Sequence, residues 1–230
     1  MLSLVAPRHP RSLLLTLLVS AGVFGCFGNE TLAFPPGLEP AAEVHEAPFP
    51  EGDSADPFPE RLELIRTTAE NARQNPPSVH GSAYVQAPLS VVWEALRNPD
   101  VSADRRAFDS YEVEADVEPE YDYSYRIDAT INNIITVEYS TNFRHGVIEG
   151  TLEAPSAVAI AWQKTEGSTI IAELRGSIIA RAVTEDVTSL EMIQYGRTAM
   201  SNHEDNETYL TDVFEAVVAL TDGQPLPDVD

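Results

Sequence analysis

Few residues of this 230-residue sequence belong to the types that carry out covalent chemistry. There is no G-x-S-x-G sequence, no glycine-rich phosphate loop and only one cysteine, Cys26. The five histidines are scattered and show no metal-ligand spacing; they are His9, His45, His80, His145 and His203. The sequence therefore predicts no catalytic residue, no metal and no cofactor, and the covalent chemistry that it indicates is a modification of the Cys26 thiol.

Cys26 ends a segment with the parts of a signal peptide. Arg8 and Arg11 give a positive start, and residues 13–24 form an apolar run without a charge. A bilayer-spanning helix needs about 20 apolar residues, so this run is too short to span, but it suits the core of a signal peptide. The residues at 23–26, Val-Phe-Gly-Cys, resemble the lipobox of bacterial lipoproteins.

The lipobox resemblance implies that residues 1–25 are removed and that Cys26 carries a diacylglyceryl group and, on its new amine, an acyl chain such as palmitate. Two or three chains anchor a protein stably, at about 0.8 kcal/mol per buried methylene. We therefore expect an exported, lipid-anchored protein of the cell envelope, in the periplasm or on the cell surface. The alternative is an ordinary cleaved signal with a cysteine nearby by chance, but no A-x-A-like site follows closely.

Residues 26–59 differ in composition from the rest of the chain. Seven of the 17 prolines lie between residues 27 and 59, mixed with acidic residues. Such sequence buries little apolar surface, and its like charges extend it. We predict a tether that lifts the folded part off the membrane; the alternative is a loop packed on the domain.

The charge of the chain excludes several partners. The formal net charge is −23, and removal of the two arginines of the signal peptide leaves 12 basic and 37 acidic residues, a charge of −25. Nucleic acid and anionic lipid headgroups both require a basic face, so neither is an expected partner. The acidity itself is typical of a solubility or habitat adaptation and identifies no ligand.

The remaining residues predict one domain with a sizeable core, at 77–223, followed by a tail at 224–230. Residues 60–76 have apolar residues at helical spacing and predict a leading helix. A short strand follows at 80–86, then a helix beginning near Pro88 and a second short helix at 100–107.

Period-two alternation dominates the middle of the domain. Strands are predicted at residues 111–117, 121–129, 135–143, 157–164, 169–183 and 187–197. One polar face indicates antiparallel strands with one side on a core and the other in water. Residues 206–220 are predicted to form a helix with an apolar stripe along one side. Acidic residues and N-cap candidates lie at its start, and Gly223, a typical C-cap residue, follows its end.

This order defines an α+β fold and resembles the START-like superfamily, also called the SRPBCC, helix-grip or polyketide cyclase/dehydrase fold. Residues 85–100, Val-Gln-Ala-Pro-Leu-Ser-Val-Val-Trp-Glu-Ala-Leu-Arg-Asn-Pro-Asp, are similar to the opening unit of that family. Gly167-Ser168, Gly176-Ser177 and the terminal helix extend the resemblance. It implies a curved antiparallel sheet of six to seven strands wrapped around a long C-terminal helix, with two short helices after the first strand.

The resemblance also implies a cavity between sheet and helix, which in relatives holds lipids, sterols, hydroxylated aromatics or polyketides. The inward-facing apolar residues are the candidate ligand-binding residues, although each also suits ordinary core packing. They are Tyr123, Tyr125, Val137, Tyr139, Phe143, Leu174, Ile178, Met192, Leu210 and Phe214.

Some START-like relatives are enzymes that use polar residues of the pocket as acid or base. The charged candidates here alternate onto the polar, outer face of the predicted sheet: Arg126, Asp128, Glu138, Arg144 and Arg175. We therefore expect a membrane-anchored binding or carrier protein for a hydrophobic lipid, sterol-like or aromatic molecule. The alternatives are a cyclase- or hydrolase-type enzyme on the same fold and a non-catalytic interaction protein of the cell envelope.

Overall fold

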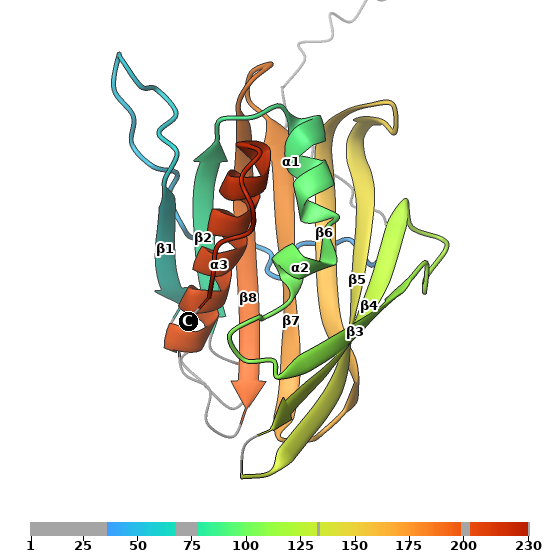
Figure 1. Ribbon diagram of the computed structural model, residues 1–230. Helices are drawn as coiled ribbons and strands as arrows, with labels where there is room; N and C mark the ends of the chain where they lie inside the picture. Colours follow the sequence, from blue (N-terminus) through green and yellow to red (C-terminus); the bar gives the residue numbers. More distant parts are fainter. Residues whose placement is uncertain (1–35, 68–77, 133, 199–202, 230) are drawn as a thin grey trace, which may run out of the picture. The chain divides into compact units, whose positions relative to one another are not determined.

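The computed structural model describes residues 36–67, 78–132, 134–198 and 203–229 (Figure 1). The chain divides into two units, Met1–Leu32 and Ala33–Asp230, and everything described lies in the second. The predicted signal peptide and Cys26 lie outside the described residues. Within the described part, no helix has the length and apolar character needed to cross a membrane.

One antiparallel sheet of eight strands organises the domain, in the order β1-β2-β8-β7-β6-β5-β4-β3. The strands are β1 (Leu62–Thr67), β2 (Ser78–Val85), β3 (Ser110–Ala115), β4 (Tyr123–Asn132), β5 (Thr136–Thr151), β6 (Ala154–Gly167), β7 (Ile171–Ala182) and β8 (Thr188–Thr198). The helices are α1 (Leu89–Leu96), α2 (Pro99–Ser102) and α3 (His203–Thr221). The sheet is curved and open, and all three helices lie on one side of it (Figure 1), which we call the inner face.

The core fills the space between the inner face and the helices. Tyr125 and Ile127 of β4 point into it, as the alternation predicts, while Ser124 and Arg126 point to the outer face. The apolar stripe of α3 closes the core from the other side, with Leu210, Val213, Phe214 and Val217 buried. This is the helix-grip α+β architecture that the sequence predicts.

The predicted leading helix at 60–76 is wrong for its first half. Residues 62–67 form strand β1, which pairs antiparallel with β2, and residues 68–77 lie outside the described part. Leu62 and Leu64, two residues apart, both pack against the core, which a strand achieves and a helix does not. The sequence predicts a sheet of six to seven strands. With β1 included, the sheet has eight strands.

The predicted second helix is shorter than expected. α2 ends at Ser102 instead of Ala107, and residues 103–109 form turns. The Asn98 side chain accepts a hydrogen bond from the Asp100 N–H at 3.1 Å and so caps the start of α2. Asp104 Oδ1 accepts from the Ala107 N–H at 3.2 Å, a turn that replaces further helix.

The prediction of a free tether is wrong for much of residues 36–59: residues 51–57 are exposed, but the segment at 36–50 packs on the outer face of the sheet. We call this segment the strap. The Ala41 N–H donates to Ser177 Oγ at 2.9 Å, and Ser82 Oγ donates to the Ala47 carbonyl at 2.9 Å. Leu38 packs against Ala159 and Ile179. The strap therefore shields Ala159 and Ile179 of the outer face from water. This agrees with the alternative prediction of a loop packed on the domain.

Candidate functional site

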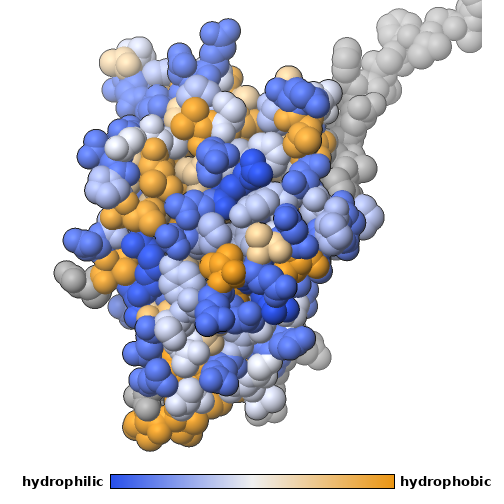
Figure 2. All heavy atoms as spheres, turned by 45° about the vertical axis from the view of Figure 1, so that its right-hand side comes forward, coloured by the Kyte–Doolittle hydropathy of each residue, from blue (hydrophilic) through white to orange (hydrophobic). Residues whose placement is uncertain are grey.

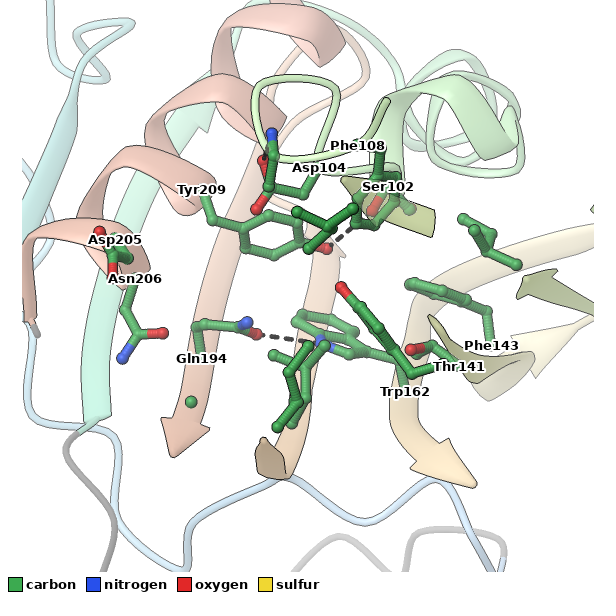
Figure 3. Close-up of a pocket in the computed structure, with 17 residues that line it drawn as sticks. Ser102, Asp104, Phe108, Thr141, Phe143, Trp162, Gln194, Asp205, Asn206 and Tyr209 are labelled. Atoms are coloured by element: carbon green, nitrogen blue, oxygen red, sulfur yellow. Dashed lines mark hydrogen bonds between the residues drawn. The ribbon is translucent and has the colours of Figure 1, made fainter. Parts of the chain in front are cut away.

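A cavity of about 190 Å³ lies between the inner face of the sheet, the start of α3 and the turns after α2 (Figure 3). Seventeen residues line it: Ser102, Asp104, Ala107, Phe108, Ile127, Ile131, Tyr139, Thr141, Phe143, Trp162, Ile171, Leu174, Gln194, Gly196, Asp205, Asn206 and Tyr209. The cavity occupies the place that the helix-grip resemblance implies.

Three aromatic rings that contact one another line the cavity. Phe143 of β5 stacks on Trp162 of β6 with ring centroids 6.0 Å apart, and Trp162 lies 6.0 Å from the ring of Tyr209 on α3. Gly176 of β7 permits this arrangement, because a Cβ at that position would lie 2.1 Å from Trp162 Cζ2. Gly176 thus marks close packing against an aromatic ring and not extra room for a ligand.

Polar side chains interrupt this apolar wall, among them Thr141, Gln194 and Tyr209. Trp162 Nε1 donates to Gln194 Oε1 at 3.0 Å, and the Tyr209 hydroxyl donates to the Ser102 carbonyl at 3.1 Å (Figure 3). Thr141 differs from them, because its hydroxyl is buried and has no hydrogen-bond partner among the described residues. A buried hydroxyl without a partner costs free energy, so Thr141 is the group at which a ligand's polar atom gains most.

One carboxyl group at the cavity has a shifted pKa. Burial raises the pKa of Asp104, hydrogen bonding from the Ala107 N–H opposes the shift, and the charges of Asp212 and Asp205 add to it. Burial also raises the pKa values of Tyr139 and Tyr209, so both phenols stay protonated. The cavity therefore offers the protonated phenol of Tyr139 and a carboxyl that takes up a proton more readily than a surface aspartate.

The ten predicted ligand-binding residues are divided between cavity and core. Tyr139, Phe143 and Leu174 line the cavity. Six others are buried in the core away from it: Tyr125, Val137, Ile178, Met192, Leu210 and Phe214. Tyr123 lies half-buried at the far end of β4, where the Arg97 guanidinium sits 4.7 Å from its ring centroid. The structure thus brings together three of the ten.

Several cavity residues do not stand out in the sequence. Thr141 shares the inward face of β5 with Tyr139 and Phe143, but a polar residue on an apolar face is not selected by an apolar pattern. Ile171 lines the cavity because a register irregularity between Ile171 and Glu173 shifts the alternation at the start of β7. Trp162 lies in a run that is apolar on both faces, for which period-two patterning gives no orientation.

The charged residues considered for acid–base chemistry do not line the cavity. Arg126 contacts Glu114 and Asp128, Arg144 contacts Glu118 at 2.6 Å, and Arg175 contacts Glu173 at 2.8 Å. Glu138 is exposed. The described ranges contain no group of three or more histidine, cysteine or acidic side chains placed to hold a metal ion.

The order of the elements and of the strands in the sheet is that of the helix-grip fold, which the resemblance of the sequence to the START-like superfamily implies. No protein-family model matches the chain, and no curated protein matches it.

Solved structures with a similar course of the chain include an aromatase/cyclase, Zhui, from Streptomyces sp. R1128, with 18% identity and a TM-score of 0.40 over 63% of this chain and 93% of that one. The lipid transfer and protein localization domain of human StarD13 has 11% identity and a TM-score of 0.48 over 81% and 91%. A STAR-related lipid transfer protein from Xanthomonas axonopodis has 12% identity and a TM-score of 0.46 over 70% and 93%.

Proposed function

We propose that this protein binds a compact hydrophobic molecule in the cavity between sheet and α3, and that a lipid on Cys26 holds it at a membrane of the cell envelope. The cavity carries the proposal. Its wall is apolar over most of its area, it carries polar side chains that can orient a ligand, and it is preformed, which is the usual character of a small-molecule site.

The size of the cavity limits the ligand. Pockets for drug-sized ligands measure about 300–1,000 Å³, so about 190 Å³ suits a one- or two-ring aromatic or a short acyl chain. The unsatisfied Thr141 hydroxyl and the protonated Tyr139 phenol favour a ligand with one hydroxyl or carbonyl group. The net charge of the chain disfavours an anionic ligand.

A second candidate function is acid–base catalysis on the same ligand. Asp104, with its raised pKa, lines the cavity together with Tyr139 and Tyr209, and its charge contributes to the raised pKa values of both tyrosines. Such a convergence is the arrangement from which a general acid is built. Under this alternative, Asp104→Asn abolishes turnover of a bound ligand while leaving its affinity nearly unchanged.

The two tryptophans of the chain allow a direct binding test. Trp162 lines the cavity and Trp93 does not, so Trp93→Phe leaves a single fluorophore at the site. Titration with neutral one- and two-ring phenols and short-chain alcohols is expected to change the Trp162 emission with saturation. Thr141→Val keeps the shape of the side chain and removes its hydroxyl, and it is expected to weaken binding of hydroxyl-bearing ligands about tenfold.

A cavity-filling variant supplies the matched control. Ala107→Phe places a ring in the cavity and is expected to abolish the titration, whereas Val113→Phe adds the same ring to the exposed strand β3 and is expected to leave binding unchanged. Equal titration curves for these two variants would contradict a ligand in this cavity.

A further inference from the structure

A second cavity lies between the strap and the outer face of the sheet, on the opposite side of the sheet from the ligand cavity. It measures about 170 Å³, its roof is formed by residues 37 and 39–41 of the strap, and its walls come from β5, β6 and β7. We call it the outer cavity. Figure 2 turns the β3–β5 end of the sheet towards the viewer and shows mostly hydrophilic atoms. A ligand on this side of the domain is therefore expected to be polar.

The register of three strands builds the floor of the outer cavity. Asn142 of β5, Gln163 of β6 and Arg175 of β7 lie side by side in one row, and Arg144 of β5 pairs with Ala161 of β6 in the next row. Residues two apart on a strand share a face, so all five side chains belong to the outer face. Ala161 has only a methyl group, which leaves space between the two arginines on either side of it.

The Arg144 guanidinium forms one wall of the outer cavity. Its Nε and Nη2 donate to the two carboxylate oxygens of Glu118 at 2.6 and 2.9 Å, and it lies 5.3 Å from the ring centroid of Tyr121. Its Nη1 makes no hydrogen bond to the described residues and lies 3.0 Å from the place where a Cβ of Gly37 would be, in the roof of the outer cavity. Arg144 is thus fixed by Glu118 and keeps the two N–H donors of Nη1 for a ligand.

The Arg175 guanidinium is held in a similar way on the other side. Its Nε donates to Glu173 at 2.8 Å, its Nη1 donates to the Ala41 carbonyl at 2.7 Å, and it lies 4.0 Å from the ring centroid of Tyr195. Its Nη2 makes no hydrogen bond within the part of the chain that the structure describes. Two guanidinium groups with fixed positions and unused donors therefore line one cavity.

We propose that the outer cavity binds the phosphate group of a small molecule between Arg144 and Arg175. Guanidinium groups are the preferred phosphate donors of proteins, and each one can bind an anion on one edge while a carboxylate holds another edge. The amide groups of Asn142 and Gln163 add donors from two further positions. Donors from three strands suit a tetrahedral oxyanion better than a planar carboxylate. This site is separate from the ligand cavity and does not depend on the proposed function.

The charges close to the outer cavity decide how tightly a phosphate is held. The net charge of −23 acts over the whole surface, and physiological salt screens charges beyond about 8 Å. Glu118 and Glu173 neutralise part of the arginine charge, and Glu39 of the strap also lines the outer cavity. Glu39 Oε2 accepts a hydrogen bond from the Gly37 N–H at 2.7 Å. Glu39→Gln keeps an acceptor for this bond, removes a like charge and is expected to tighten phosphate binding about fivefold.

Calorimetric titration of the full-length protein with inorganic phosphate, at fixed ionic strength in a maltoside detergent, tests the inference. Saturable binding is expected for the parent protein, and Arg144→Gln and Arg175→Gln are each expected to weaken it about tenfold or more. Arg126→Gln is the matched control. Arg126 lies on the outer face of β4, is likewise paired with carboxylates and does not line the outer cavity, so its loss is expected to leave binding unchanged.

A cavity-filling variant tests the position without changing any charge. Ala161→Leu places a larger side chain on the floor of the outer cavity and is expected to abolish phosphate binding. The urea midpoint of each variant shows whether it folds. If the variants of the floor and walls fail to fold, the tighter binding expected of the exposed Glu39→Gln still decides the question.

Two further titrants identify the source of the phosphate group. Glycerol phosphate represents a soluble phosphate monoester, and glycerophosphocholine represents the headgroup of a lipid; arginine-dependent binding of either supports the inference, and the tighter of the two names the source. Three results overturn it. They are the absence of saturable binding, an equal loss in Arg126→Gln and Arg144→Gln, and tighter binding of acetate than of phosphate, which would indicate a carboxylate site.

Discussion

Lowering the pH from 7 to 5 is expected to destabilise the folded domain by about 4 kcal/mol, because two buried histidines are neutral in the folded state. Burial lowers the pKa of His80 to about 4 and that of His145 to about 3, from the ordinary value of 6.5. The unfolded chain takes up protons first as the pH falls. The stabilisation is therefore complete above pH 6.5 and is lost as the pH falls towards the two folded-state values, at about 2 kcal/mol for each histidine by pH 5.

The surroundings of the two histidines explain why they resist protonation. His145 lies on the inner face between the rings of Tyr123 and Tyr125, at 5.3 and 5.6 Å, and neither ring nitrogen has a hydrogen-bond partner among the described residues. The charge of Arg97 adds to the effect of burial. The site thus provides a cation near the imidazole and no acceptor for a second N–H, so a protonated His145 would be costly.

His80 lies on the outer face, under the strap. Its Nδ1 accepts a hydrogen bond from the Glu46 N–H at 3.0 Å, and the ring of His45 lies 5.2 Å away. Protonation of Nδ1 removes this acceptor and places a positive charge beside His45. Acid is therefore expected to release the strap as well as to lower the stability of the domain.

Urea unfolding at pH 7 and pH 5 measures the effect. His145→Leu is expected to reduce the pH-dependent loss of unfolding free energy by about 2 kcal/mol, and His80→Gln, whose amide oxygen can still accept from the Glu46 N–H, is expected to reduce it by a similar amount. A loss that stays the same in both variants would show that other groups govern the acid response.

Truncation of Leu38 in the strap is expected to cost about 2–5 kcal/mol of unfolding free energy. Leu38 is 2% exposed and packs on Ala159 and Ile179 of the outer face. Leu38→Ala removes these contacts and leaves a cavity that the sheet beneath cannot close. A leucine in a free tether would contribute nothing, so the size of the effect distinguishes a packed strap from a tether.

Val44 of the same strap is the matched control. It is exposed, and Val44→Ala is expected to change the unfolding free energy by less than about 0.5 kcal/mol. Chemical denaturation of the two variants beside the parent protein makes the comparison. Equal, small effects at both positions would mean that the strap does not pack on the sheet in solution.

The elements that the sequence predicts well are those with a long, regular pattern. Alternation at Tyr125 and Ile127 correctly identifies the inner face of the sheet, and the stripe formed by Leu210, Val213 and Phe214 identifies the buried face of α3. These patterns hold because one face of each element must leave water. The order of the elements then favours one fold.

The predictions from sequence fail for segments whose structure depends on contacts with residues far away in the chain. Residues 62–67 have apolar residues at both helical and strand spacing. They form a strand because the edge of β2 offers backbone groups with which they pair. Leu38 lies in a proline-rich acidic segment, and only the apolar outer face of β6 and β7 makes it a buried residue. Composition indicates whether a segment can order itself alone and says nothing of a surface supplied by the rest of the chain.

The cavity is less predictable than the fold, for a physical reason. Met192 and Gln194 both face inward from β8, yet Met192 is packed in the core and Gln194 lines the cavity. The difference arises from where α3 begins, which leaves the end of the sheet uncovered by its apolar stripe. Alternation identifies the inward face of a strand, but the boundary between packed core and cavity is set by the element packed above it.

The central claim, a compact hydrophobic ligand in the cavity, is tested most directly by native mass spectrometry of the protein purified from its own host, followed by organic extraction. We predict a neutral bound molecule of one or two rings or a short chain, retained by the parent protein and by Val113→Phe and absent from Ala107→Phe. A parent protein that carries no such molecule and binds none from a panel of neutral aromatics and lipids would contradict this claim, and an interaction role in the cell envelope would take its place.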